Sequence, residues 1–154
     1  MNEQDIKMQL NAWRLFLLLH SKIIDVVDRD IQQQGGGLPL NHYDVLIELQ
    51  VAPNKRLRLY ELAKRVVLSR SSITRLVDTL EKLSLLQREP DPEDRRGAYA
   101  ILTTQGEQAL QASWPLYSKA IMQHFGHYLS NEEAAIISQS FSRIYNEEQF
   151  GDAS

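Results

Sequence analysis

The stretch between Arg56 and Thr103 decides the fold of this chain. It contains Ser69-Arg70-Ser71-Ser72-Ile73-Thr74-Arg75 and, further on, Pro90-Asp91-Pro92-Glu93-Asp94-Arg95-Arg96-Gly97. The first sequence opens the second of two amphipathic helical segments, which only a few residues separate, as in a helix-turn-helix. The second sequence, with two prolines and a glycine, predicts a hairpin with a polar tip. Helix, turn, helix and hairpin in this order predict a winged helix-turn-helix.

Positive charge is concentrated in the same part of the chain. From Lys55 to Arg75 there are seven Lys or Arg residues and one acid, Glu61, whereas the whole chain has a formal net charge of −3. A basic surface on an acidic protein is typical of a surface that contacts phosphates. The sequence therefore predicts a protein that binds double-stranded DNA.

Long amphipathic segments flank this unit. The first has apolar residues at alternating spacings of four and three, with a second apolar stripe beside them. We expect one face to pack within the protomer and the other against a second subunit. Ser130 and Glu133 form a capping box that opens the last helix. A single domain of residues 1–154 is expected, with dimerisation helices at 1–34 and 104–150 and a DNA-binding lobe at 41–103. The main stripe is Ile6, Leu10, Trp13, Leu17, His20, Ile24, Val27 and Ile31.

The expected fold class is mainly α with a small two-stranded β wing. Local signals predict where two further helices begin. Asn41 and Asp44 resemble an N-cap pair, and Thr103 or Thr104 is expected to cap the long helix after the hairpin. Glu107 would complete a capping box with Thr104.

The residues expected to contact DNA lie on the second helix of the motif and at the hairpin tip. The first turn of a recognition helix faces base edges, where Arg can bind guanine and Ser or Thr can bind bases or phosphates. Arginines at a wing tip suit a narrow minor groove. A solvated helix and a solvated loop are the alternative interpretations. The expected DNA-binding residues are Arg70, Ser71, Ser72, Thr74, Arg75, Arg95 and Arg96.

Acidic residues surround the two tip arginines. Glu89, Asp91, Glu93 and Asp94 leave the tip with little net charge. We expect at least one of these acids to hold an arginine in an ion pair within the subunit, and Asp94 is the one we predict to do so.

Together these motifs resemble those of the MarR family of bacterial transcriptional regulators, over nearly the full length of the chain. The resemblance is carried by Leu62-Ala63, by Ser69-Arg70-Ser71 continuing to Thr74-Arg75-Leu76-Val77, and by Asp94-Arg95-Arg96-Gly97 through Leu102-Thr103. Ala100 stands where the family's wing signature has its first leucine.

The resemblance implies a triangular homodimer in which each subunit presents one winged helix-turn-helix to DNA. Such a dimer would bind a pseudo-palindrome whose half-sites lie roughly 10–10.5 bp apart. The resemblance also implies a regulator, most often a repressor, that releases DNA when a small, often aromatic anion binds between the lobes.

A small-molecule effector would need a pocket with aromatic walls and a few polar groups. The alternative is that Trp13 and Leu17 belong to the dimer core and that His20 is a satisfied histidine in an apolar seam. The residues expected to border an effector pocket are Trp13, Leu17, His20, His42, Tyr43 and Leu46. Because the chain has no cysteine, the peroxide-sensing branch of the family is disfavoured.

Other functional classes fit the sequence less well. The absence of cysteine excludes disulfides and thiolate metal sites. His124 and His127, spaced i and i+3, could share a zinc ion with His42, so a metal-responsive regulator is one alternative. A nonspecific architectural DNA-binding protein is another, and it would bind any duplex with a steep salt dependence.

No enzyme and no cofactor are expected. Gly35-Gly36-Gly37 follows a helix rather than a strand, so it does not match a dinucleotide-binding loop. The acidic N-terminus lacks the apolar core of a secretory signal, and the apolar run Leu15 to Leu19 is too short to span a bilayer. The sequence therefore predicts a cytoplasmic protein without membrane partners.

Overall fold

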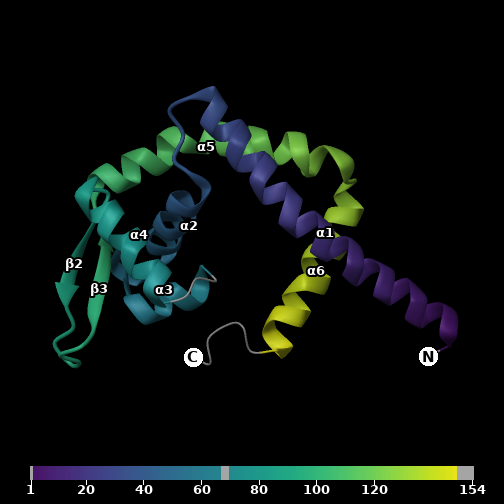
Figure 1. Cartoon of the computed structure of the whole chain (residues 1–154), viewed down its shortest axis with the longest axis horizontal. Helices are drawn as coiled ribbons and strands as arrows, with labels where there is room; N and C mark the ends of the chain where they lie inside the picture. The colour runs from purple at the N-terminus through teal and green to yellow at the C-terminus, as the bar shows by residue number, and fades with distance from the viewer. Residues whose placement is uncertain (1, 67–69, 149–154) are drawn as a thin grey trace.

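A long helix, α5 (Thr104–His124), connects the two parts of an arch in this computed structural model (Figure 1). The structure describes residues 2–66 and 70–148, without the side chains of Arg70 and Ser71. One part contains α2 (Leu40–Val51), the turn η1 (Pro53–Lys55), α3 (Leu59–Arg65), α4 (Arg70–Lys82) and a small sheet. The other part contains α1 (Glu3–Gln34), the turn η2 (Gly126–Tyr128) and α6 (Asn131–Glu147). The expected mainly α fold with a β wing is confirmed.

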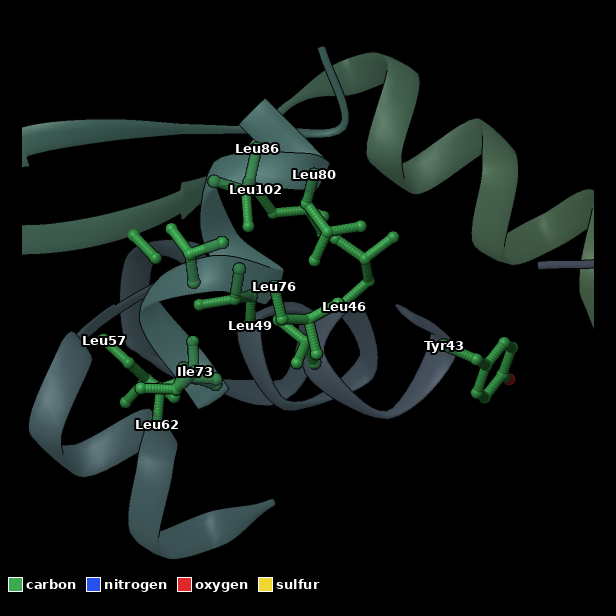
Figure 2. Close-up of a cluster of buried hydrophobic side chains, with 14 of the residues drawn as sticks. Tyr43, Leu46, Leu49, Leu57, Leu62, Ile73, Leu76, Leu80, Leu86 and Leu102 are labelled. Atoms are coloured by element: carbon green, nitrogen blue, oxygen red, sulfur yellow. The ribbon is translucent and has the colours of Figure 1, made fainter. Parts of the chain in front are cut away.

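The main hydrophobic core lies under α4, where α2, α3, the sheet and the start of α5 meet (Figure 2). The inner face of α4 contributes Ile73, Leu76, Val77 and Leu80, all of them buried as the helical spacing predicts. Leu83 is 53% exposed, because α4 ends at Lys82 and the chain turns away. This packing fixes which face of α4 points outward.

The sheet has three antiparallel strands in the order β1-β3-β2. Strands β2 (Leu86–Pro90) and β3 (Ala98–Leu102) form the predicted hairpin, which projects from the lobe (Figure 1). The third strand, β1 (Arg56–Arg58), was not predicted because three residues are too short to show a clear alternation. Leu57 of β1 is buried opposite Ala100, so its two neighbouring arginines share the other face of the sheet.

The helix caps differ in part from those predicted. The prediction of Asn41 and Asp44 as an N-cap pair is wrong, since α2 begins after Pro39 without a local side-chain cap. Instead, the backbone N–H of Leu40 donates to Asp28 Oδ1 of α1 at 2.8 Å. This contact ties the end of α1 to the start of α2.

Thr103 caps α5, because its hydroxyl accepts the N–H of Gly106 at 3.0 Å. The predicted capping box of Thr104 with Glu107 is wrong, since the Glu107 carboxylate pairs with Lys55 instead. The capping box of Ser130 and Glu133 at the start of α6 is confirmed.

The two ends of α1 have different surroundings. Near its C-terminal end, Val27 and Ile31 are buried against Leu40 and Ala120. The N-terminal half extends away from the lobe (Figure 1) and exposes a row of large apolar side chains. No helix in the described part of the chain is long and apolar enough to cross a membrane. The exposed row includes Ile6, Leu10, Trp13, Leu17 and Ile24.

We predict that Asp28→Ala destabilises the protein by about 1 kcal/mol, because the Leu40 N–H at the positive end of α2 loses its acceptor. Thermal or urea unfolding measures this change. Asp25→Ala is the matched control, since Asp25 is exposed on the same helix. Asn41→Ala should also have little effect, and a larger loss for Asn41→Ala than for Asp28→Ala would contradict the cap assignment.

Candidate nucleic-acid interface

The outward face of α4 is the first part of the candidate site. Because Ile73, Leu76 and Val77 point into the core, Thr74 and Arg75 point outward, and both are exposed. Ser72 is half-buried. The backbone of Arg70 and Ser71 belongs to the first turn of α4, and the positive N-terminal end of a helix dipole attracts anions.

Further positive charge lies close to this face. Lys64 and Arg65 occupy the last turn of α3, which packs against α4. Arg65 Nη1 lies 3.6 Å from Glu48 Oε2, so part of its charge is neutralised, whereas Lys64 Nζ lies 5.8 Å from the centre of the Tyr60 ring. The two helices together present cations and hydroxyl groups beside the wing.

Residues 91–97, which we call the wing tip, form the second part of the site. The backbone N–H of Asp91 donates to the Gly97 carbonyl at 3.1 Å, and Gly97 N–H donates to the Asp94 carbonyl at 3.0 Å. The Asp94 carboxylate accepts the backbone N–H of Arg96 at 3.0 Å. Arg95 and Arg96 are both exposed. The loop therefore presents two arginines on a hydrogen-bonded turn.

An arginine outside the wing holds the wing tip. Arg58 of β1 donates from Nε to Asp91 Oδ2 at 2.7 Å and from Nη2 to Glu93 Oε2 at 2.8 Å. The expected ion pair within the subunit thus exists, but among the described side chains it is made by Asp91 and Glu93 rather than by Asp94. The Asp94 carboxylate accepts a backbone N–H of its own loop, and because the Arg70 side chain lies outside the described part of the structure, an ion pair of Asp94 with an arginine stays a prediction.

The Asp91 carboxylate is the most enclosed charge of the wing tip, with 3% of its side chain exposed. Its pKa is lowered, first by the hydrogen bond from the Glu93 N–H and then by the Arg58 side chain. The same contact raises the pKa of the Arg58 guanidinium. Both groups therefore carry their charges at neutral pH.

Arg58 was not among the predicted site residues. It precedes Asp91 by 33 residues, and no local pattern links the two positions. The one available signal was the alternation of Arg56, Leu57 and Arg58, which places both arginines on one face if the segment is a strand.

A second arginine fixes the base of the wing to α4. Arg88 of β2 contacts Asp78 at 2.6 Å and Glu81 at 3.2 Å, and its backbone N–H donates to Glu81 Oε2 at 2.7 Å. The pKa of the Glu81 carboxyl is lowered mainly by the Arg88 side chain. Two separate ion-pair clusters thus orient the wing, one at its base and one at its tip.

A cleft of about 360 Å³ separates α4 from the wing tip. Thr74 and Arg96, both predicted to contact DNA, line this cleft, although 22 residues separate them in the sequence. Arg58 and Tyr60 form part of its floor together with Asp91. The tertiary structure therefore brings the two predicted groups of DNA-contacting residues to one surface.

The residues predicted to border an effector pocket do not lie together as the predicted DNA-contacting residues do. Leu46 is fully buried in the core, and its role as a pocket-lining residue stays a prediction. Tyr43 is buried and stacks on Tyr117, with ring centroids 4.1 Å apart. His42 is half-buried on α2, where burial lowers the pKa of its imidazole and Asp28 opposes that change. Its Nδ1 is buried without a hydrogen-bond partner among the described residues.

The other three predicted pocket residues, Trp13, Leu17 and His20, lie on the exposed half of α1. Trp13 is about 22 Å along the helix from Asp28, at 1.5 Å per residue, and Asp28 is the residue that caps α2 near His42. Trp13 and His42 of one protomer therefore cannot line a single small pocket.

The histidines do not form the arrangement that a metal-responsive regulator would need. His124 ends α5 and its Nε2 lies 3.2 Å from Asp30 Oδ2. His127 lies in the following turn η2, where its ring meets Tyr128 edge-on. Within the described ranges, no three His, Cys, Asp or Glu side chains are grouped as metal ligands are. The expected pair on one helix face is therefore not present.

Comparisons with known proteins agree with this geometry. A model of the MarR family matches residues 36–97. The HTH-type transcriptional regulator MhqR of Bacillus subtilis is 32% identical over 147 residues, covering 93% of this chain and 98% of MhqR. The transcriptional repressor MprA of Escherichia coli is 27% identical over 141 residues, covering 90% and 79% of the two chains.

The fold is also similar to that of a solved member of this family. Sco3205, a MarR family transcriptional regulator from Streptomyces coelicolor solved in complex with DNA, superposes with a TM-score of 0.78. It is 32% identical, and the match covers 92% of this chain and 88% of Sco3205. With a winged helix-turn-helix, long flanking helices and relatives matched over nearly their full length, this chain belongs to the MarR family of transcriptional regulators.

Proposed function

We propose that this protein is a homodimeric, sequence-specific DNA-binding repressor that acts on a pseudo-palindromic operator. The observation that carries the proposal is the cleft that Thr74 of α4 and Arg96 of the wing tip line together. In this arrangement α4 enters the major groove and the wing tip reaches the adjacent minor groove. Ser72 and Arg75 of α4 and Arg95 of the wing tip complete the described part of the DNA-binding surface.

The side chains of α4 and those of the wing tip suit different contacts with DNA. Arg75 can hold the two acceptors of a guanine edge, while Thr74 and Ser72 can donate to bases or phosphates. Arg95 and Arg96 suit a narrow minor groove, whose negative potential attracts guanidinium groups. Arg70 and Ser71 are proposed to contact DNA as well, since their backbone lies in the first turn of α4.

The relatives support DNA binding and repression. Sco3205 was solved in complex with DNA, and MprA is described as a transcriptional repressor. At about 30% identity the regulatory role transfers to this chain as a proposal rather than as a property of the fold. An architectural DNA-binding protein is the competing function, and specificity distinguishes the two.

The proposed homodimer is supported by apolar surface that one protomer leaves uncovered. None of the 17 residues of α6 is buried, although Ile136, Phe141, Ile144 and Tyr145 are large and apolar. Helices of this length are marginal in water unless an apolar face is packed. The contact described between the rings of Phe16 on α1 and Phe141 on α6 leaves both side chains more than 40% exposed.

The exposed half of α1 continues this surface. Trp13 is 58% exposed, and its neighbours along the helical stripe are similarly accessible. Contiguous apolar surface of this kind marks a protein interface. We therefore assign α1 and α6 to a symmetric interface between two copies, in which each helix meets the partner subunit.

We further propose that an aromatic effector binds near His42, at the junction between α2 and α1. The support is the buried Nδ1 of His42, which has no hydrogen-bond partner among the described residues, on the same helix as Tyr43, whose ring stacks on Tyr117. A phenolic hydroxyl would give this nitrogen a partner. Because Asp28 lies close enough to influence His42, a neutral aromatic ligand fits better than an anion.

Arg75→Ala is expected to weaken binding to a specific operator by about 1–3 kcal/mol. The operator is obtained by selecting duplexes from a random library and by footprinting the DNA that flanks the gene, in the presence of competitor DNA. Lys82→Ala is the control, because Lys82 lies on the same helix but in its last turn. Equal binding by Arg75→Ala and wild type would remove Arg75 from the interface, and loss of wild-type binding to competitor would favour an architectural role.

Removal of residues 130–154 is expected to disrupt the dimer, because α6 would no longer supply its apolar face. Leu10→Glu tests the same interface without truncation, since it places a charge on the exposed stripe of α1. Sedimentation velocity measures both variants, and Lys22→Glu on the same helix is the control. A folded, dimeric truncated protein that still binds DNA would contradict this architecture.

His42→Ala is expected to abolish the response to a neutral phenolic effector while leaving operator affinity within about twofold, because His42 lies outside the DNA-binding surface. A panel of phenols and benzoates is titrated into the protein–operator complex, and release is measured by fluorescence anisotropy. Release of the variant at wild-type concentrations, or release of wild type by benzoates alone, would refute the assignment.

A further inference from the structure

The wing tip depends on contacts outside the hairpin for its position. The ladder between β2 and β3 ends at the pair Pro90 and Ala98, so residues 91–97 lie beyond the sheet. Among the described residues, the backbone hydrogen bonds of this loop join residues of the loop itself and close a turn. A short hairpin end of this kind has few packing contacts to define its orientation.

Arg58 supplies a connection from the lobe to the wing tip. Its backbone N–H donates to Glu61 Oε2 in the first turn of α3 at 3.0 Å, so the residue is fixed at the junction of β1 and α3. Its guanidinium passes the Tyr99 ring, 5.2 Å from the ring centre, and then reaches Asp91 and Glu93. The tip is thus tied to the element that precedes α3.

The contact between Arg58 and the wing tip depends on the position of the Asp91 carboxylate. Its carboxylate is almost wholly enclosed and also accepts the Glu93 N–H at 2.9 Å. At neutral pH a buried carboxylate that loses its cation is destabilised, and it regains solvation only if the loop moves. The Arg58 side chain is therefore linked to the conformation of the turn that carries the tip arginines.

The charge of Arg58 is already matched by two carboxylates, Asp91 and Glu93. It therefore adds little to the positive potential that DNA meets, although it lies within the basic stretch of the sequence. Arg88 has the same relation to Asp78 and Glu81 at the base of the wing. These two arginines connect protein elements to each other, whereas Arg95 and Arg96 are exposed at the wing tip.

We propose that Arg58 is a positioning residue for DNA binding, which acts through Asp91 to set where the wing tip lies relative to α4. This inference rests on the proposed DNA-binding function and adds a determinant for it. Arg58 does not read the operator itself. It fixes the distance between the contacts of α4 in one groove and those of the wing tip in the next.

Removing a negative charge from the wing tip distinguishes a positioning role of Arg58 from simple electrostatic attraction between the protein and DNA, because the two predict opposite changes in affinity. Asp91→Asn removes a negative charge close to DNA, so attraction alone predicts tighter binding. Positioning predicts weaker binding, by roughly tenfold, because the tip contacts lose their alignment. Glu89→Gln is the matched control, since it removes the same charge from an exposed side chain of the same hairpin and should bind as tightly as wild type or more tightly.

The role of Arg58 is tested by removing its side chain and by replacing it with lysine. Arg58→Ala should weaken binding by roughly the same factor as Asp91→Asn. Arg58→Lys should restore only part of the affinity, because an ammonium group cannot bind two carboxylates with the geometry of a guanidinium fork. The melting temperature of each variant shows whether the fold is intact.

A double-mutant cycle shows whether Arg58 acts through the tip. In a protein that carries Arg95→Ala and Arg96→Ala, the further change Arg58→Ala should alter operator affinity by less than about twofold. Additive losses, or tighter binding by Asp91→Asn, would overturn the proposal and indicate that Arg58 contacts DNA directly.

A measurement without DNA separates this inference from the proposed function. Hydrogen exchange at the amides of Asp91 and Gly97 should accelerate in Arg58→Ala and Asp91→Asn but not in Glu89→Gln. If the wild-type protein selects no operator, the proposed function fails whatever the exchange data show. If wild type binds an operator and both variants exchange and bind as it does, the positioning role alone is refuted.

Discussion

The burial of one face of α4 is the constraint on which the rest of the DNA-binding lobe depends. Ile73, Leu76, Val77 and Leu80 fill the core between α2, α3 and the sheet (Figure 2). A helix held by four such residues cannot rotate without exposing them, which would cost several kcal/mol, about 1.5–3 for each side chain. The outward direction of Thr74 and Arg75 is a consequence of this packing. The wing is then held in place relative to α4. Arg88 attaches the base of the wing to α4, and Arg58 attaches the wing tip to β1.

The arginines of this lobe have two distinct physical roles. Arg58 and Arg88 each bind two carboxylates and connect elements that are distant in sequence. Arg95 and Arg96 are exposed at the wing tip, where a phosphate or a minor groove can reach them. Net charge alone does not distinguish these roles, since both pairs contribute equally to the basic character of the sequence. The acids of the wing differ in a similar way, since Asp91 is enclosed while Glu89 is exposed.

The dimer proposal rests on a different kind of evidence, namely surface that is apolar and uncovered. The end of α1 is anchored by Val27 and Ile31, whereas its N-terminal half and all of α6 have no comparable core within the protomer. Asp28 connects α1 to the DNA-binding lobe. It belongs to α1, but its carboxylate accepts the backbone N–H of Leu40 in the first turn of α2. In the proposed dimer, a change in how the subunits pack would reach the lobe through α1.

The sequence by itself determined the order of the elements, the buried face of α4 and the residues that α4 and the wing tip expose. These features follow from helical spacing, turn residues and local charge, which act over a few residues. It did not determine β1, the α2 cap or the partner of Arg58, because each depends on residues 12 to 45 positions apart that only the folded chain brings together. Nor did it determine that Leu46 is fully buried in the lobe, since periodicity marks a residue as apolar without showing which core will bury it. The tertiary structure also decided that Thr74 and Arg96 line one cleft.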